Sequence, residues 1–360
     1  MSAVPTFHSL QVVQLRTEGL NGKAITLHVP EALRKTFAFK PGQYMVVRAT
    51  IAGKSCQRSY SVCSTPERLY TTGDIEIGVR AVPGGVFSVW ATTELTTGQR
   101  LEAMPPDGRF VSTHPHARHT VCFAAGSGIT PVLSLIASGL ASNTHSRYSL
   151  VYGNQRMQSV MFNESLQDLK DRYPQRLSLM HVLSRQEQDI ALLQGRIDED
   201  KVMALTNTVL PAADIDEVFV CGPAAMMHAT VTGLQRAGVA AERIHSELFG
   251  DAHAPQQTTP KTVTQTNKGI DLRIICNGKQ HSIPMADGDN PLSAGLEAGL
   301  DLPYSCRNGV CCTCRAKVLE GKVSMHKNFT LTSEEIAQGF VLSCQAKTLT
   351  PKLVLSFDER

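Results

Sequence analysis

Four cysteines constrain this chain more than any other feature. The first three, Cys306, Cys311 and Cys314, follow C-x4-C-x2-C spacing, and the fourth, Cys344, comes after a further 29 residues. This spacing is one that holds a 2Fe–2S cluster by four thiolates. Gly309 lies inside the loop, where backbone N–H groups must turn toward the sulfurs. The pattern predicts a metal site with these four ligands, in a protein that transfers single electrons.

A zinc site is the alternative for these cysteines, but zinc ribbons favour two paired CxxC units. Cys312 lies next to Cys311, and its use as a ligand would change the spacing to x5 and then x1. We therefore expect Cys312 not to be a ligand. The remaining cysteines have no framework spacing: Cys56, Cys63, Cys122, Cys221 and Cys276.

Composition is typical of a multidomain enzyme. The 360 residues are too many for one ordinary core and suggest two or three domains. The first residues lack a charged segment followed by an apolar run, and no stretch approaches the roughly 20 apolar residues of a membrane span. With a net charge of +3 and no dense basic block, nucleic acid is not an expected partner. We expect a cytoplasmic protein with no membrane partner.

Residues 1–112 are rich in short alternating runs that Gly, Pro and Asn interrupt, as in a β-barrel or sandwich. The clearest runs are Gln11–Leu15, Ala24–Val29, Tyr44–Ala49 and Asp74–Ala81. The pattern changes in residues 113–250, where apolar strands alternate with helical segments. The strands are Thr120–Ala125, Tyr148–Tyr152, Ser178–Leu183 and Glu217–Cys221. This alternation predicts an α/β domain with a doubly wound parallel sheet.

Residues 251–267 have two prolines, five threonines and three glutamines, and we interpret them as a linker. Beyond them, Ile270–Cys276 and Lys279–Pro284 flank Asn-Gly, a strong hairpin signal. Pro291–Gly299 predicts a short helix before the cysteine loop. Residues 268–360 therefore fit the small α+β (β-grasp) ferredoxin fold.

Two short motifs in residues 1–112 suggest a flavin site. Arg58-Ser-Tyr-Ser61 ends a predicted strand, and Pro83-Gly-Gly-Val-Phe-Ser88 follows one strand later. Tyr60 can stack on a flavin ring, Ser61 can hydrogen-bond its edge, and Arg58 can pair with phosphate. The glycine turn before the predicted helix Val86–Thr92 offers backbone N–H groups to a diphosphate. By itself RSYS arises easily by chance on a surface strand. The candidate flavin-binding residues are Arg58, Ser59, Tyr60, Ser61, Arg80, Gly84, Gly85, Val86 and Ser88.

The order of these motifs resembles the ferredoxin–NADP reductase superfamily over the whole chain, and within it the tripartite reductases of oxygenases. The resemblance rests on FKPGQ, AAGSGITP, LVYGNQRMQSVMF, GRID, VCGPAAMM, YSCRNGVCCTC and FVLSCQA. With these segments the chain most resembles the reductase components of phenylacetyl-CoA 1,2-epoxidases, which serve aerobic phenylacetate breakdown. The resemblance implies an antiparallel β-barrel for FAD, NADPH as electron donor and a multisubunit di-iron epoxidase as partner.

The dinucleotide signal is weak by itself, because Gly126-Ser-Gly128 is not a complete GxGxxG motif. It does lie between a predicted strand and a predicted helix, and Pro131 suits the first helical turn. The resemblance implies that this segment binds the nicotinamide dinucleotide and that Cys221 approaches the reacting ring. A small packed residue at a strand end is the alternative for Cys221. The candidate residues are Gly126, Ser127, Gly128, Thr130, Pro131, Cys221, Gly222 and Pro223.

The choice between NADPH and NADH depends on the ribose 2′ position, where NADP enzymes offer basic residues. Ser184 and Arg185 follow a predicted strand and resemble the 2′-phosphate clamp of plant ferredoxin–NADP reductases; Arg156 can add a second cation. Solvated loop arginines are the alternative. We favour NADPH, with NADH possible.

The resemblance also implies an acidic group and an aromatic ring beside the flavin, at Glu247 and Phe249. The candidate catalytic residues are Tyr60, Ser61, Cys221, Glu247 and Phe249. The predicted activity is hydride transfer from NADPH to FAD, followed by single-electron transfer through the cluster to the oxygenase. Alternatives are a reductase of another aromatic-ring oxygenase, a reductase of the hybrid-cluster protein, or a redox sensor without turnover.

Overall fold

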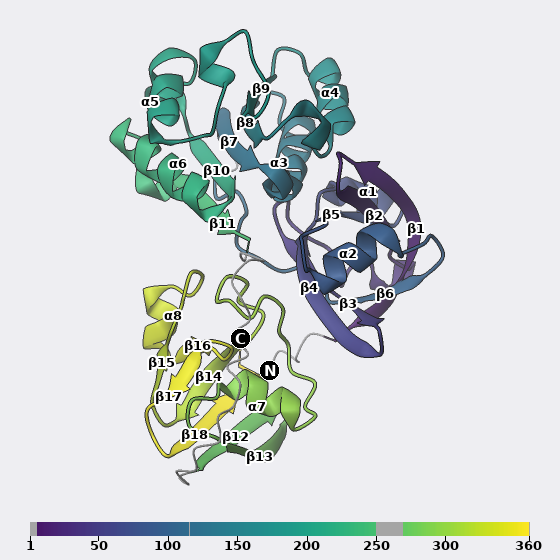
Figure 1. The fold of residues 1–360 in the computed structure, drawn as a ribbon, viewed down its shortest axis with the longest axis vertical. Helices are drawn as coiled ribbons and strands as arrows, with labels where there is room; N and C mark the ends of the chain where they lie inside the picture. The colour runs from purple at the N-terminus through teal and green to yellow at the C-terminus, as the bar shows by residue number, and fades with distance from the viewer. Residues whose placement is uncertain (1–5, 115, 250–268, 360) are drawn as a thin grey trace. The chain divides into compact units, whose positions relative to one another are not determined.

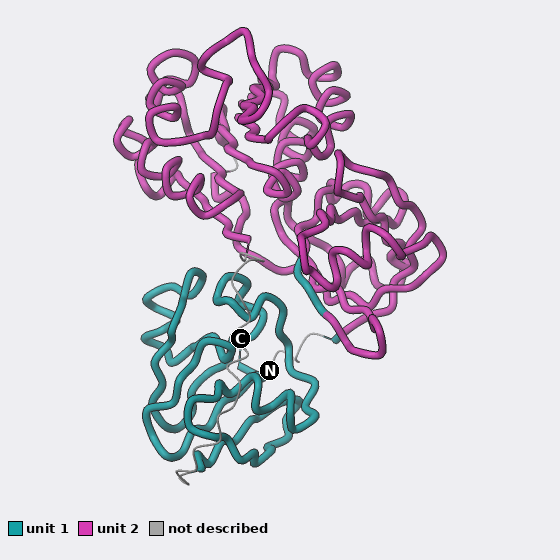
Figure 2. The backbone as a smooth tube through the Cα atoms, viewed as in Figure 1, with its two compact units in different colours: residues 1–6, 57–59, 250–360 teal, residues 7–56, 60–249 magenta. Residues whose placement is uncertain are grey.

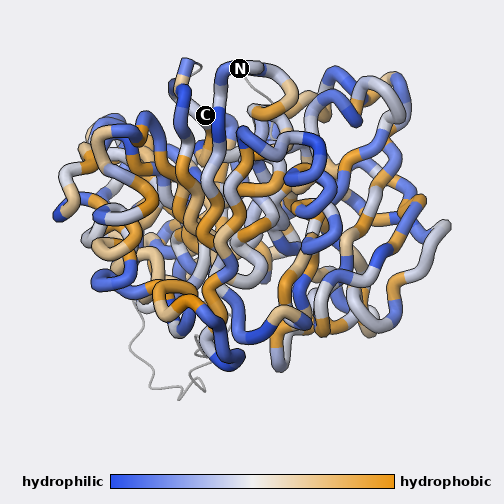
Figure 3. Tube along the Cα trace, turned by 90° about the horizontal axis from the view of Figure 1, so that it is seen from above, coloured by the Kyte–Doolittle hydropathy of each residue, from blue (hydrophilic) through white to orange (hydrophobic). Residues whose placement is uncertain are grey.

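The computed structural model describes residues 6–114, 116–249 and 269–359 (Figure 1). Its backbone divides into two compact units, one with residues 7–56 and 60–249, the other with residues 1–6, 57–59 and 250–360 (Figure 2). The predicted linker, residues 251–267, lies outside the described residues. Hydrophobic stretches run along the strands, and hydrophilic residues gather in the connecting loops (Figure 3).

In the part of the larger unit that comes first in the chain, six strands form one sheet in the order β4-β3-β6-β1-β2-β5. They are β1 (His8–Glu18), β2 (Gly22–His28), β3 (Tyr44–Ile51), β4 (Lys54–Ser61), β5 (Asp74–Arg80) and β6 (Arg100–Ala103). Val62, directly after β4, forms a β-bridge with Ile77 of β5. Because β4 and β5 are the outermost strands in the order, this bridge closes the sheet into the expected barrel.

The barrel is packed on both sides of strand β2. Ile25 and Leu27 point into the barrel core, together with Leu69 of helix α1 (Pro66–Thr71) and Phe87 of helix α2 (Val86–Thr93). Successive strand residues face opposite ways, so Ala24 points outward, and it is buried in a second core that also contains Cys122 and Leu150. Strand β2 is therefore shared between the two halves of the larger unit.

The second half of the larger unit has a five-stranded sheet in the order β11-β10-β7-β8-β9, parallel throughout. Its strands are β7 (His119–Ala125), β8 (Arg147–Asn154), β9 (Leu177–Leu183), β10 (Glu217–Gly222) and β11 (Ile244–Leu248). Its helices are α3 (Ile129–Ser142), α4 (Asn163–Arg172), α5 (Glu199–Thr208) and α6 (Ala224–Arg236).

Two separate cores cover the faces of this parallel sheet. On one face α3 and α4 pack against Cys122, Leu150 and Phe219, and on the other α5 and α6 pack against Val121 and Val151 (Figure 1). The predicted doubly wound sheet is thus confirmed. The order changes direction between β7 and β10, so the carboxyl ends of these two strands form the crevice where such sheets bind ligands.

The smaller unit has a mixed sheet in the order β13-β12-β18-β14-β16 and a separate pair, β15 with β17. Its elements are β12 (Ile270–Cys276), β13 (Lys279–Met285), α7 (Pro291–Glu297), β14 (Arg315–Glu320), β15 (Val323–Met325), α8 (Ser333–Ala337), β16 (Phe340–Leu342), β17 (Ala346–Thr348) and β18 (Lys352–Ser356). The predicted hairpin is confirmed, because Asn277 and Gly278 have φ values of 53° and 71°, as its type I′ turn requires.

Short 3-10 helices complete the described elements: η1 (Glu31–Leu33), η2 (Gly126–Gly128), η3 (Met157–Ser159), η4 (Ala191–Leu193), η5 (Ala212–Asp214) and η6 (Ala241–Arg243). Helix α7 ends two residues before the predicted Gly299, which has a φ of +82° and turns the chain out of the helix. No helix within the described ranges is long and apolar enough to cross a membrane.

Candidate functional site

The loop between β7 and α3 lies at the change of strand direction. It contains Gly126, Ser127 and Gly128 and leads into α3, where Pro131 occupies the first turn. Gly126 has a φ of +55°, which favours glycine. A Cβ on Gly128 would overlap the carbonyl oxygen of Cys221, at the end of β10. The two predicted dinucleotide segments are therefore neighbours, and residue 128 must be glycine for them to approach.

Three predicted side chains meet beside this crevice. Cys221 of β10 pairs in register with Glu247 of β11. The Ser61 hydroxyl, from β4 of the barrel, donates a long hydrogen bond of 3.4 Å to Glu247 Oε2. These residues are far apart in sequence, and the packing of the barrel against the parallel sheet brings them together. The chain thus places a hydroxyl, a thiol and a carboxyl group where the two halves of the larger unit join.

Burial controls the protonation of Glu247 and Cys221. It raises the pKa of Glu247 to about 8, and the hydrogen bond from Ser61 opposes the shift. The side chain keeps some exposed surface, but its carboxyl group lies among protein atoms that disfavour the charge. Burial, and then the charge of Glu247, raise the pKa of the Cys221 thiol well above its usual value. At neutral pH Glu247 is therefore largely a proton-carrying acid, and Cys221 is a thiol.

Glu247 should make the stability of the protein depend on pH. Its folded pKa of about 8 exceeds its ordinary value of 4.5, so the folded state binds more protons between these pH values. The contribution to stability is complete below pH 4.5 and is lost as the pH rises through 8. Melting temperatures of wild type and Glu247→Gln should therefore diverge across this range, with wild type losing stability, and stop diverging above it. Parallel melting curves would contradict the raised pKa.

Three further predicted residues border the same crevice. Thr130 is buried, and its hydroxyl donates to the carbonyl oxygen of Ser127 at 2.9 Å. Phe249 follows β11, is half-buried and packs against the core that contains Cys221. Pro223 is the N-cap of α6, directly after Gly222. The segments that begin at Gly126, Cys221 and Glu247 thus converge at one edge of the sheet.

The predicted flavin seat lies on β4 and α2. Tyr60 is half-buried, with its ring centroid 5.6 Å from that of Phe87. Gly85 caps α2 without a side-chain hydrogen bond, and the preceding Gly84 has a φ of +74°. The Ser88 hydroxyl accepts the N–H of Val82 and closes the turn. An uncapped helix start behind a glycine turn suits a diphosphate, so these residues fit FAD.

The remaining predicted flavin-binding residues lie on the same elements. Ser59 is half-buried on β4, and the Arg58 guanidinium donates to the carbonyl oxygen of Gln57 at 2.8 Å. Val86 is exposed at the first turn of α2. Arg80 ends β5, and its Nη1 lies 2.5 Å from the position that a Cβ on Gly126 would take. Arg80 therefore joins the flavin seat to the dinucleotide loop.

The predicted 2′-phosphate residues are in two adjoining loops at the carboxyl edge of the sheet. The backbone N–H of Ser184 donates to Asn154 at 3.0 Å, and that of Arg185 donates to Gln155 at 2.9 Å. Arg156 directly follows Gln155, and both arginine side chains are exposed. The arrangement leaves two cations available to an anion outside β8 and β9.

In the smaller unit, the four predicted ligands come from two segments. Cys306, Cys311 and Cys314 lie between α7 and β14, and Cys344 lies in the turn between β16 and β17. Donors point at the sulfurs: the Asn308 N–H lies 3.3 Å from Cys306 Sγ, the Cys306 N–H 3.5 Å from Cys311 Sγ, and the Gln345 amide 3.5 Å from Cys344 Sγ. Positive φ at Gly309, 78°, helps to turn this loop.

The thiols form two hydrogen-bonded pairs. A bond from Cys311, followed by bonds from backbone N–H groups, lowers the pKa of Cys306 to about 6, and a bond from Cys314 lowers the pKa of Cys344. No three His, Cys, Asp or Glu side chains in the described ranges are placed to hold a single ion. A 2Fe–2S cluster does not need three side chains around one ion, because each of its two irons is held by two of the four thiolates. Two thiol pairs with N–H donors fit that cluster.

Cys312 is half-buried with a φ of 51° and packs against the core of the smaller unit. It belongs to neither thiol pair. That Cys312 is not a ligand of the cluster stays a prediction.

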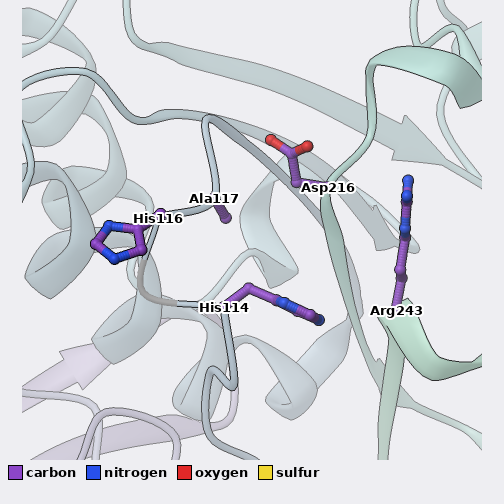
Figure 4. Close-up of a pocket in the computed structure, with 5 residues that line it drawn as sticks. All are labelled: His114, His116, Ala117, Asp216 and Arg243. Carbon is purple, nitrogen blue, oxygen red and sulfur yellow. The ribbon is translucent and has the colours of Figure 1, made fainter.

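A depression on the larger unit lies elsewhere. It has a volume of about 300 Å³ and is lined by His114, His116, Ala117, Asp216 and Arg243 (Figure 4). These residues lie at the amino ends of β7 and β10, or beside them, and the candidate site lies at the carboxyl ends. The depression is therefore separate from the predicted chemistry.

Sequence reasoning missed three residues that support the site. Tyr152 donates from its buried hydroxyl to the carbonyl oxygen of Gly126 at 2.8 Å. Glu18 and Gly78 of the barrel contact the nucleotide-binding half. A glycine inside a predicted strand signals close approach of another backbone or side chain, so Gly78 could have been found. No local pattern marks Glu18 or Tyr152.

Fold and site together define an oxidoreductase with flavin-binding, dinucleotide-binding and iron–sulfur parts. Three domain-family models match the chain: the oxidoreductase FAD-binding domain over residues 10–111, the oxidoreductase NAD-binding domain over 123–232, and the 2Fe-2S iron-sulfur cluster binding domain over 274–349. The predicted cofactor classes are thus confirmed, and the zinc alternative is not supported.

Similar proteins narrow the class further. The chain is 40% identical over 359 residues to one component of the 1,2-phenylacetyl-CoA epoxidase of Escherichia coli (strain K12), covering 99% of each. It is 33% identical to the 3-ketosteroid-9-alpha-monooxygenase, ferredoxin reductase component, of Rhodococcus rhodochrous, covering 97% of this chain and 96% of the relative. The fold matches that of phthalate dioxygenase reductase, with a TM-score of 0.58, 19% identity and 98% coverage of both chains. The chain belongs to the family of oxygenase reductase components that includes these two relatives.

Family membership confirms an electron-transfer enzyme that takes electrons from a nicotinamide dinucleotide and delivers them to an oxygenase. A redox sensor without turnover is correspondingly disfavoured.

Proposed function

We propose that this protein takes a hydride from NADPH and delivers single electrons to a multisubunit di-iron oxygenase that epoxidises phenylacetyl-CoA. The observation that carries this proposal is the 40% identity over 99% of both chains to the component of the Escherichia coli 1,2-phenylacetyl-CoA epoxidase. Such full-length similarity includes all three domains and their order. When bound, FAD accepts electrons in pairs and releases them singly, and the 2Fe–2S cluster carries one at a time.

We assign the cofactors to the predicted domains: FAD to residues 1–112, the dinucleotide to residues 113–250 and the cluster to residues 268–360. The open start of α2 binds the FAD diphosphate, and Tyr60 stacks on the flavin ring. The loop around Gly126 to Gly128 binds the dinucleotide diphosphate at the start of α3. The four thiolates of Cys306, Cys311, Cys314 and Cys344 hold the cluster.

The residues at the junction of the two halves orient the reaction. Ser61 and Glu247 share a hydrogen bond, and Glu247 carries a proton at neutral pH because of its raised pKa. We propose that this pair hydrogen-bonds the flavin edge, with protonated Glu247 as the donor, and that Cys221 shapes the nicotinamide side. Phe249 shields the flavin face when the dinucleotide is absent. No charged nucleophile is needed, since the cofactors supply the chemistry.

The preference for NADPH rests on Arg185 and Arg156, which are exposed in adjoining loops at the sheet edge. Replacement of Arg185 by alanine should raise KM for NADPH about tenfold, because a charge-assisted contact to the 2′-phosphate is lost. KM for NADH should change little. Steady-state kinetics with both donors measure the difference. Arg147→Ala is the control. This exposed arginine begins β8, at the end of the strand away from Arg156, and pairs with Asp214. Equal effects on both donors would remove the NADPH assignment.

A second candidate function is the reductase of a different oxygenase. The 33% identity to the 3-ketosteroid-9-alpha-monooxygenase reductase component over 97% of this chain favours it. A reductase of the hybrid-cluster protein stays a further alternative. These functions differ in the partner and share the internal electron route.

The decisive experiment measures NADPH oxidation by the purified reductase together with the oxygenase component of the epoxidase, with and without phenylacetyl-CoA. Strong stimulation by the thioester supports both the electron route and the partner. If the rate of NADPH oxidation does not change with the thioester while cytochrome c is still reduced rapidly, the protein remains a reductase and the proposed partner is wrong.

A further inference from the structure

A short segment of the nucleotide-binding half, residues 159–162, lies against the barrel. It ends at Phe162, a fully buried residue with a φ of 57°, directly before α4. The Phe162 backbone N–H donates to Glu18 Oε2 across 2.6 Å, although the two residues are 144 positions apart. Glu18 ends strand β1 and is itself buried. A short hydrogen bond to a charged acceptor is a strong one, so this contact links the two halves.

The barrel holds the Glu18 carboxylate in place from the other side. Arg16 Nε donates to Glu18 Oε1 at 2.7 Å, and Arg16 Nη2 lies 3.5 Å from Glu76 Oε1. Arg68 Nη1 binds the second oxygen of Glu76 at 3.2 Å. Both carboxylates are buried and paired with arginines, which fixes their positions. A network of barrel side chains thus holds the Glu18 carboxylate in position for the Phe162 N–H.

Glycines let the segment approach the barrel closely. A Cβ on Gly78 of β5 would lie 2.5 Å from the Thr130 methyl group and 2.8 Å from the Phe162 ring. A Cβ on Gly19 would lie 3.1 Å from the backbone of Ser159. Larger residues at these positions would push the two halves apart. Strand β5 continues from Gly78 to Arg80, so the contact adjoins the flavin seat.

The segment also connects to the dinucleotide loop. The Tyr152 hydroxyl lies 2.8 Å from the carbonyl oxygen of Gly126 and 3.4 Å from that of Met161. Thr130, which touches the Gly78 position, lies in the first turn of helix α3 beside the same loop. A shift of Met161 and Phe162 would therefore be transmitted to both Gly126 and Thr130.

We infer that Glu18 is a positioning residue for hydride transfer, because it fixes the nucleotide-binding half at the distance from strand β5 that the two ring systems require. The inference rests on the proposed function of the larger unit. Hydride transfer needs near-contact of donor and acceptor, and an error of about 1 Å can cost on the order of 100-fold in rate. Glu18 touches neither ring, so its effect passes through Phe162.

Two measurements on the full-length protein test this inference. Amide hydrogen exchange of peptides that contain Phe162, without added nucleotide, reports the contact itself. Stopped-flow reduction of the bound flavin by NADPH reports its consequence. Glu18→Ala should accelerate exchange at Phe162 and slow flavin reduction at saturating NADPH about tenfold or more, with a smaller change in KM. Glu18→Gln, which keeps an oxygen acceptor, should restore most of both.

Further variants separate positioning from folding. Glu102→Ala removes an exposed barrel carboxylate paired with Arg48 and should change neither readout. Gly78→Ala should slow flavin reduction like Glu18→Ala, and Gly269→Ala, where nothing lies within 4 Å of the new Cβ, should not. Wild-type rates in Glu18→Ala, or no rescue by Glu18→Gln, would overturn the inference. If wild type itself fails to take electrons from NADPH or NADH, the proposed function fails, and amide exchange still tests the contact.

Discussion

Replacement of Cys344 by serine is expected to abolish electron delivery to the oxygenase while flavin reduction by NADPH continues at the wild-type rate. Cys344 is the only one of the four predicted ligands that comes from the turn between β16 and β17, and its thiol pairs with that of Cys314. Without it, one of the two irons keeps a single protein thiolate. Flavin absorbance after mixing with NADPH measures the first step, and oxygenase-coupled turnover measures the second.

The matched control is Cys312→Ser, which changes a cysteine of the same loop that belongs to neither thiol pair. This variant should keep the visible and electron paramagnetic resonance spectra of the cluster and most of the turnover. A Cys344→Ser protein with a normal cluster spectrum would remove Cys344 from the ligand set. Loss of the cluster in Cys312→Ser alone would shift the ligand set by one position.

The second large effect is expected from Gly128→Ala. The new Cβ would overlap the Cys221 carbonyl oxygen, which belongs to a strand that pairing with β7 holds in place. The dinucleotide loop must therefore move away from β10, which displaces the nicotinamide from the flavin. Flavin reduction should slow on the order of 100-fold, because transfer depends steeply on alignment. Stopped-flow absorbance with NADPH measures the rate.

This prediction requires that the variant still folds and binds FAD. The flavin seat on β4 and α2 lies outside the altered loop, so FAD content should match wild type. Gly269→Ala supplies the control, since the same substitution there meets no neighbouring atom. Wild-type rates in Gly128→Ala would show that the loop does not position the dinucleotide.

The parts of the fold that sequence predicted are those with strong local signals. Apolar runs located the central strands β7, β8 and β10, and Asn277-Gly278 located a hairpin that the backbone dihedrals confirm. The cysteine spacing was equally local, because three of the four candidate ligands lie within nine residues. Such signals depend on neighbours in the chain, so no tertiary information is needed to read them.

The parts that sequence did not predict depend on contacts between distant residues. Ser61 and Glu247 are separated by 186 positions, and the raised pKa of Glu247 follows only from the way two halves pack around it. The barrel closure between Val62 and Ile77 is likewise a single bridge without a motif. Short elements such as α8 and β15, with five and three residues, are too brief to show a period.

Strand β18 occupies the middle of its sheet, yet it follows all the other strands of that sheet in the chain. During synthesis, β12 leaves the ribosome before its neighbour β18 has been made. At about 5–20 residues per second, several seconds pass between the synthesis of the two strands. All four candidate ligands emerge during this interval, before the sheet that frames them can close. The flavin- and dinucleotide-binding halves have by then been completed. The parts of the chain that take up electrons are therefore complete before the part that passes them on, and the four cysteines lack their finished sheet until β18 has been made.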